Sequence, residues 1–228
     1  TLRFQIVQND SLKIRMGGKT GEAIPFKPVE LKESNVSAYV ALKKVSVNIP
    51  DVYDTNLFDF TGPKKFDEST GYRSQSMLVV PMRNHENDVI GVLQLLNATN
   101  PVSKKIVSFS KDYENLCESL ASQAAVSITN AKLIVNMTEL FEAFVKVMAT
   151  AIDEKSPVTG GHIRRVADLT LTLAEVIHHT KEGPYKDITF SPDQIYELKI
   201  AAYMHDIGKV TSPVEIVEKA KKLQTIFD

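Results

Sequence analysis

The feature that most constrains the fold of this 228-residue chain is a long stretch without helix breakers. Residues 110–156 contain no proline and no glycine. Alternating steps of four and three define a series of twelve positions, ten of them apolar: Tyr113, Cys117, Leu120, Ala124, Ser127, Ala131, Ile134, Thr138, Phe141, Val145, Met148 and Ile152. This spacing predicts one helix, or two in near-continuous series, with a seam that can pair with another helix. About forty residues would span about 60 Å, so the helix must link two domains or lie in a dimer.

The chain before this helix has the pattern of a mixed α/β domain. Residues 2–7 and 45–49 are predicted strands, residues 37–42 a short helix, and residues 51–74 a loop-rich segment with Gly62-Pro63 and Gly71. Residues 76–82 and 89–96 are β-rich runs around a short polar turn, which predicts an antiparallel hairpin. Because both runs are almost continuously apolar, we expect them to be central strands covered on both faces.

The chain after the long helix is predicted to be all helical. Ser156-Pro157 and Gly160-Gly161 break the helix, and a new amphipathic helix begins near His162. Its predicted apolar face is Ile163, Val166, Leu169 or Thr170, Leu173 and Ile177. After a polar connector, Ser191-Pro192-Asp193-Gln194 has the pattern of a capped helix start. That helix carries Ile195, Leu198, Ala202 and His205 on one face, and we expect it to end at Gly208.

Composition excludes several classes of protein. Lys and Arg together number 27 against 28 Asp and Glu, so no basic field favours nucleic acid. The single cysteine, Cys117, cannot form an internal disulfide, which fits a reducing compartment, and we expect a cytoplasmic protein. No apolar run approaches the ~20 residues of a membrane helix, so no membrane insertion is expected. Both ends of the sequence look cut, and we interpret the chain as a fragment of a larger protein.

The residues best suited to chemistry are His205 and Asp206, at the end of a predicted helix. A neutral imidazole nitrogen and a carboxylate oxygen can ligate one divalent metal if the helix end turns them towards one point. Gly208 allows a sharp turn, and Lys209 places a cation where it could hold a phosphate. His162 begins the preceding helix, and a helix start can meet a neighbouring helix end, so a shared metal is geometrically feasible. The alternative is structural: a His-Asp hydrogen bond, and a His162 that bonds a backbone carbonyl.

These motifs in combination resemble the opening of HD-GYP domains, which belong to the HD superfamily. The resemblance covers about residues 138–228. It is carried by the segment from Gly161 to Ala167, by His205-Asp206-Ile207-Gly208-Lys209, and by Pro213, Glu215 and Ile216, followed by Lys219 to Leu223. It implies an all-α domain that holds two or three iron or manganese ions and hydrolyses cyclic di-GMP. By position, His162, His205 and Asp206 would be metal ligands, and Lys209 would contact the substrate phosphate, making Asp206 and Lys209 catalytic.

The sequence departs from the HD-GYP pattern in places. The later histidines, the last ligand Asp and the Gly-Tyr-Pro segment of the family would follow Asp228. The usual Lys-Pro-Gly-Lys turn is Lys219-Ala220-Lys221-Lys222. Some members carry an extra acidic ligand near the start of the domain, where this chain has Asp153 and Glu154.

The front part resembles a GAF domain. The likeness covers roughly residues 1–130 and is carried by residues 72–81, by residues 89–97 and by the helix start at residues 109–112. The first helix and strand of that fold are expected upstream of Thr1. Cyclic-nucleotide-binding GAF domains carry an Asn-Lys pair where this chain has Asn97-Ala98. We therefore expect a GAF domain that dimerises or binds a small molecule whose identity the sequence leaves open.

The predicted protein is α+β: a GAF sensor over residues 1–110, a linking helix over 111–152, and the start of an HD-GYP bundle over 153–228. Its predicted function is metal-dependent hydrolysis of cyclic di-GMP under GAF control. The rivals are an HD hydrolase of another nucleotide and a degenerate HD domain that relays a GAF signal to a partner protein. We expect a parallel homodimer along the 113–152 helix. In the alternative, residues 113–131 pack on the GAF sheet and residues 138–152 form the first helix of the HD bundle.

Overall fold

The computed structural model describes residues 1–19, 21–154 and 161–212. Its contacts divide the chain into two compact units, Thr1–Lys132 and Leu133–Asp228. The predicted break at Ser156-Pro157, and the stretch from Pro213 to Leu223 that contributed to the HD-GYP resemblance, lie outside the described residues.

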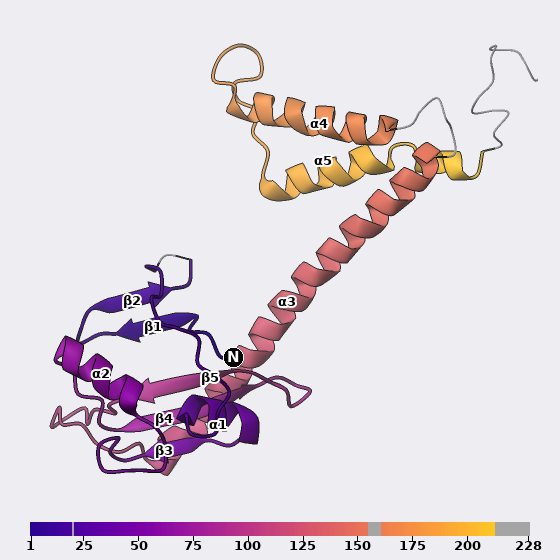
Figure 1. Cartoon of the computed structure of the whole chain (residues 1–228). Coiled ribbons are helices and arrows are strands. Elements are labelled where there is room, and N and C mark those ends of the chain that lie inside the picture. Colours follow the sequence, from indigo (N-terminus) through magenta and orange to yellow (C-terminus); the bar gives the residue numbers. More distant parts are fainter. Residues whose placement is uncertain (20, 155–160, 213–228) are drawn as a thin grey trace, which may run out of the picture. The chain divides into compact units, whose positions relative to one another are not determined.

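The first unit is built on a three-stranded antiparallel sheet of order β3-β4-β5 (Figure 1). The strands are β3 (Val47–Ile49), β4 (Met77–Arg83) and β5 (Val89–Leu96), and β4 and β5 form the predicted hairpin. A second, two-stranded sheet pairs β1 (Ile6–Asn9) with β2 (Ile14–Gly17). Only β4 is central within the described residues, because no strand there pairs with the outer edge of β5, so the prediction of two central strands was wrong for β5.

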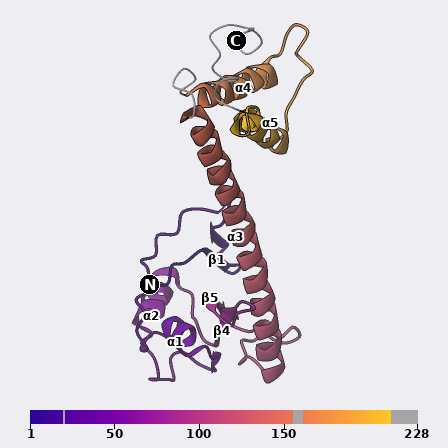
Figure 2. The same ribbon diagram turned by 90° about the vertical axis from the view of Figure 1, so that its right-hand side faces the viewer.

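Each face of the central sheet carries its own core. Met77 and Val79 of β4 pack with Val36 and Val40 of α1 (Val36–Lys43) on one face. Leu78 and Val80, which point the other way, pack against Ala121 of α3 (Lys111–Glu154). Within this unit the sheet therefore lies between α1 and the first part of α3 (Figure 2). The continuous apolarity of β4 is explained, because both of its faces are covered.

The loop-rich interpretation of residues 51–74 was wrong, because α2 (Thr61–Thr70) lies within that segment. Gly62-Pro63 indicates a turn, but the first turn of a helix tolerates proline, because the amide that proline lacks has no intrahelical partner there. Gly71 ends α2 in the left-handed conformation at φ 70°. The short helix predicted over residues 37–42 is confirmed by α1, which Asn35 caps by accepting the Ala38 amide at 3.1 Å.

The long helix is confirmed as a single element, α3, of 44 residues. Ser110 caps it, because its hydroxyl accepts the Tyr113 amide at 3.3 Å. In the first unit, Cys117, Ala121 and Ala125 face the sheet or are buried. In the second unit, Val145, Ala149 and Ile152 are buried. The structure therefore has the packing described by the alternative interpretation, in which each end of the helix packs against its own unit.

This packing corrects the predicted seam. Cys117, Val145 and Ile152 belong to the predicted series, yet their side chains contact their own unit. Leu120, Ile134 and Phe141 are exposed, as a seam in the separate chain must be. Three apolar residues that each precede a position of the series by one are also exposed: Leu116, Met137 and Phe144. A strict four-three period could not distinguish these adjacent faces, because both carry apolar side chains.

The second unit places two helices against the end of α3. They are α4 (His162–His179) and α5 (Pro192–Met204), which lie in contact with each other (Figure 1). The capping box of Ser191 and Gln194 is present as predicted. The chain leaves α5 through a 3-10 turn, Ile207–Val210, instead of continuing as a helix to Gly208.

The apolar face of α4 differs in part from the prediction. Ile163, Ala167 and Ala174 are its buried residues, whereas Leu169 and Leu173 are more than half exposed. Of the two residues proposed for one position, Thr170 is the more buried. Two of the three buried residues of α4 are therefore small alanines.

Candidate metal centre

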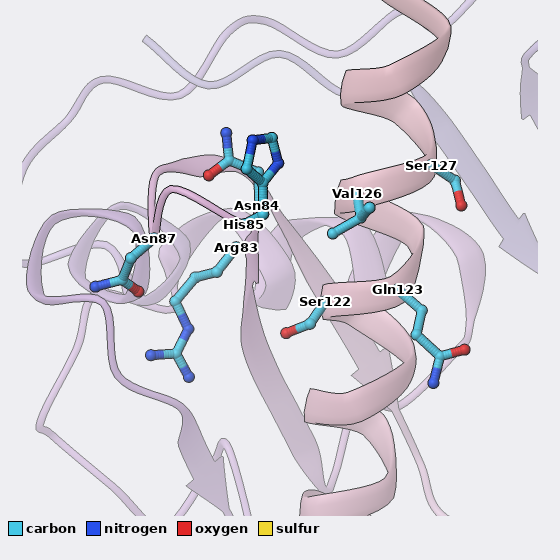
Figure 3. Close-up of a pocket in the computed structure, with 8 residues that line it drawn as sticks. All are labelled: Arg83, Asn84, His85, Asn87, Ser122, Gln123, Val126 and Ser127. Carbon is cyan, nitrogen blue, oxygen red and sulfur yellow. The ribbon is translucent and has the colours of Figure 1, made fainter.

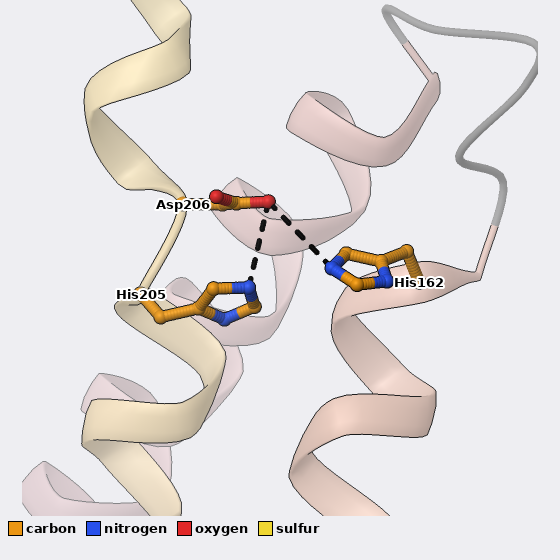
Figure 4. A group of neighbouring side chains, drawn as sticks. All are labelled: His162, His205 and Asp206. Atoms are coloured by element: carbon orange, nitrogen blue, oxygen red, sulfur yellow. Dashed lines mark ion pairs between the residues drawn. The ribbon is translucent and has the colours of Figure 1, made fainter.

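Three predicted ligand residues meet at the ends of two helices. His162 is the first residue of α4, His205 caps the end of α5, and Asp206 follows it. One ligand atom from each lies within 4.8 Å of the others (Figure 4). The helix break at Gly161 and the 3-10 turn after α5 thus bring together side chains that are far apart in the sequence.

The carboxylate of Asp206 lies at the middle of the group. Its Oδ2 atom is 3.4 Å from Nε2 of His205 and 3.9 Å from Nε2 of His162 (Figure 4). The two imidazole rings meet edge to face, with their centroids 5.5 Å apart. Two imidazole nitrogens and a carboxylate oxygen are a donor set that suits iron, manganese or zinc.

The tautomer of His205 is fixed by its neighbour. Nδ1 of His205 lies 2.7 Å from the carbonyl oxygen of Ala202. A carbonyl can only accept, so Nδ1 carries the proton and donates it. In the neutral ring the lone pair is then on Nε2, the atom that faces Asp206, which is the arrangement commonly found in metal-bound histidines.

Lys209 contacts the same carboxylate. Its Nζ donates to Oδ2 of Asp206 at 2.5 Å, from the 3-10 turn that follows α5. The ammonium therefore lies beside the candidate ligands, and it balances the charge of Asp206. This is close to its predicted place near the phosphate, although the contact in the structure is with Asp206 itself.

The remaining candidates have different surroundings. Asp153 is 9% exposed and accepts the backbone amide of Ile163, and it is not a member of the three-residue group. The side chain of Glu154 is outside the described set. His178, a further histidine in the last turn of α4, accepts the Phe190 amide at 3.0 Å, which is a structural role. Burial raises the pKa of the Cys117 thiol, which agrees with packing and not with a nucleophile.

Asn97, half of the cyclic-nucleotide signature, has a structural role. Its backbone is left-handed, at φ 57°. Its side chain accepts the Gln75 amide at 2.7 Å and donates to the Tyr72 hydroxyl and the Arg73 carbonyl, both at 2.8 Å. The asparagine therefore fixes the segment that enters β4, and needs no ligand to explain it.

A separate open cavity of about 640 Å3 lies in the first unit, between the β4–β5 turn and α3 (Figure 3). The turn contributes Arg83, Asn84, His85 and Asn87, and α3 contributes Ser122, Gln123, Val126 and Ser127. No acidic residue is in this lining, and only Val126 is apolar. The residues that line this cavity are separate from those of the metal centre.

Comparison with known families agrees with this architecture. The GAF domain model matches residues 18–128, and the HD domain model matches residues 159–228. The chain therefore carries a GAF domain followed by an HD domain. The α+β fold class is confirmed by its antiparallel sheets, the long helix and the helical part that follows.

Individual relatives are more distant. A dual 3′,5′-cyclic-AMP and -GMP phosphodiesterase 11A of Takifugu rubripes is 32% identical over 98 residues, 43% of this chain and 10% of the relative. A cGMP-specific 3′,5′-cyclic phosphodiesterase of Drosophila erecta is 28% identical over 133 residues, 57% of this chain and 11% of the relative. The chain thus spans about a tenth of the length of these curated relatives.

Among solved structures, a type II free methionine-R-sulfoxide reductase of Thermoplasma acidophilum has a TM-score of 0.33 at 25% identity, covering 46% of this chain and 63% of that one.

None of the helices in the described ranges combines the length and apolarity that a bilayer crossing requires.

Proposed function

We propose that this chain belongs to a cytoplasmic, metal-dependent phosphodiesterase of the HD-GYP class, which hydrolyses cyclic di-GMP under the control of its GAF domain. The proposed division is a sensor over residues 1–110, a linking helix over 111–152 and a catalytic domain from residue 153. The observation that carries the proposal is the meeting of His162, His205 and Asp206 within 4.8 Å, inside the segment that the HD model matches.

The residues present fit a metal. Two neutral imidazoles and one carboxylate would hold iron or manganese, and two or three ions are expected in the proposed enzyme. When bound, the metals would supply an activated hydroxide and would polarise the phosphodiester. His205 is oriented by the Ala202 carbonyl, and Lys209 would add positive charge where the phosphate binds.

The test uses full-length protein purified without oxygen. We expect at least two iron or manganese ions per chain by elemental analysis, and conversion of cyclic di-GMP to linear products by chromatography. His205→Ala combined with Asp206→Ala should remove most of the metal and the activity. His179→Ala is the matched control, because His179 is an exposed histidine at the end of α4 and lies outside the group. An unchanged metal content in the double variant would remove the site.

A second substrate class is favoured by the relatives, whose names describe phosphodiesterases of 3′,5′-cyclic mononucleotides. The metal-loaded protein should therefore be offered cyclic AMP and cyclic GMP beside cyclic di-GMP. Cleavage of the mononucleotides alone would support an HD hydrolase of another nucleotide. Binding of metal without cleavage of any of the three would support a domain that relays a signal from the GAF ligand, a small molecule, to a partner.

A further inference from the structure

Asp153 is a buried acid in the penultimate position of the long helix α3. Its side chain is 9% exposed, and its Oδ2 and Oδ1 atoms lie 3.2 Å and 3.4 Å from the backbone nitrogen of Ile163. Ile163 follows His162 directly, so Asp153 contacts the backbone that carries the first candidate ligand. A carboxylate this buried needs a donor, and the Ile163 amide is one.

The start of α4 explains why that contact is needed. The cap residue of α4 is Gly161, at φ 74°, which offers no side chain to the first turn. The amides of the first turn have no partner within the helix, and a cap side chain usually accepts the second or third of them. Asp153 takes this role from another helix. Its negative charge also suits the positive end of the α4 dipole.

The end of α3 also supports α5. Ala149 and Ile152 of α3 form a buried cluster with Ile163 of α4, and Tyr203 of α5 packs against it. Two turns before Ala149, Glu142 of α3 accepts from Lys199 of α5 at 2.6 Å. The last four turns of α3 therefore contact both helices whose ends carry the candidate ligands.

We infer that Asp153 is a positioning residue for the metal centre: it fixes the start of α4 and thereby the place of His162. The inference rests on the proposed metal site. It gives the end of α3 a role in metal affinity, and α3 is the same continuous helix that packs on the GAF sheet through Ala121. A displacement of the end of α3 would therefore move His162 through the hydrogen bond between Asp153 and the Ile163 amide.

The competing role for Asp153 is direct ligation, as an extra acidic ligand at the start of the domain. The two roles predict different spectra. A positioning residue changes how tightly a metal binds but leaves the set of ligands the same. A ligand changes the set itself, and with it the visible absorption of bound cobalt.

The test titrates Co²⁺ into metal-free full-length protein and records the visible absorption. We expect Asp153→Ala to weaken Co²⁺ binding by about tenfold, the low end of the range for lost supporting contacts. At saturation its spectrum should match wild type. Asp153→Asn keeps an oxygen that can accept the Ile163 amide, so it should restore most of the affinity. Glu139→Ala removes an exposed acid from the same helix and should leave binding unchanged.

Each outcome decides the matter. Wild-type affinity in Asp153→Ala would overturn the inference, and so would an altered spectrum at saturation in Asp153→Asn. If Asp153→Ala does not fold, the Asp153→Asn protein still decides, because a loss of affinity there would show that an accepting oxygen is not enough. Wild-type protein that binds no Co²⁺ would instead overturn the proposed function, which separates the two failures.

Discussion

Asp206 is the residue on which the candidate centre depends most, because one of its oxygens lies near both histidines and accepts from Lys209. An anion with three cationic or polar neighbours is well stabilised, and a metal ion would share that oxygen with the ammonium. Lys209 therefore has two roles that can be separated: it balances Asp206, and it would bind phosphate. In the proposed reaction, only the second role is required.

Lys209→Ala should slow cleavage of cyclic di-GMP by the metal-loaded full-length protein while metal stays bound. Losing one preorganised positive group at the reacting phosphate costs about 100-fold in kcat or more. Metal content should not fall, because Lys209 supplies no ligand. Steady-state kinetics with parallel elemental analysis is the measurement, and Lys181→Ala, a lysine in the connector after α4, is the control. A metal content that falls with the activity would place Lys209 in the support of Asp206 instead.

The sequence was sufficient to predict the members of the group but not their support. His162, His205 and Asp206 could be identified because adjacent His and Asp at a helix end, with a second His at a helix start, are local patterns. The role of Asp153 could not, because it depends on how the end of α3 meets the start of α4. A signal existed, since Gly161 is a cap without a side chain and a nearby acid could replace it.

At the scale of elements, α3 has two kinds of surface along one helix. The alanines Ala121, Ala125 and Ala149 are buried in their own units, whereas many of its large apolar side chains are exposed. Sequence periodicity predicted the helix and its length well, because no breaker interrupts it. It could not decide which apolar face meets which neighbour, since that depends on the sheet and the later helices. Helix α2 was missed for a different reason, because its first turn contains turn-forming residues.

Glu142→Gln should reduce the loss of stability in acid. In the folded protein the ammonium of Lys199, and more weakly that of Lys146, hold the pKa of the Glu142 carboxyl below its ordinary value. A lowered pKa means that this contribution is present above the ordinary glutamate value of 4.5 and disappears as the pH falls through the folded one. For a partly exposed pair we expect about 0.5–1 kcal/mol.

The measurement is thermal unfolding of the full-length protein between pH 7 and pH 3. The Glu142→Gln protein should be less stable than wild type at pH 7 and equal to it near pH 3. Glu139→Gln serves as the control, because Glu139 is exposed on the same helix. This substitution should leave the stability unchanged both at pH 7 and near pH 3. A difference between Glu142→Gln and wild type that persists unchanged into acid would show that the ion pair contributes nothing.

At the scale of the whole molecule, the exposed apolar surface of α3 favours burial against a second chain. Eight large apolar side chains between residues 133 and 147 are exposed: Leu133, Ile134, Val135, Met137, Leu140, Phe141, Phe144 and Val147. Stable soluble chains rarely leave so much contiguous apolar surface in water. Their four-three spacing through Ile134, Met137, Phe141 and Phe144 is that of a helical seam. A parallel homodimer through this face is the arrangement that we propose, with the seam corrected to the side chains that the units leave free.

Ile134→Asp should convert this dimer to a monomer. Ile134 is 68% exposed in the single chain, so the substitution removes no contact within it. In the dimer it would lose about 1.5 kcal/mol or more of burial from each copy, about 3 kcal/mol together, which corresponds to a roughly hundredfold weaker association. A buried carboxylate pair would weaken it further.

Val135→Asp is the matched control: Val135 is similarly apolar and 56% exposed, but it lies off the seam and should leave the dimer intact. Sedimentation of the full-length protein at micromolar concentration reports the outcome. Wild-type protein that sediments as a folded monomer would disprove the dimer. Equal dissociation in the Ile134→Asp and Val135→Asp proteins would show that α3 contacts its partner through a different face.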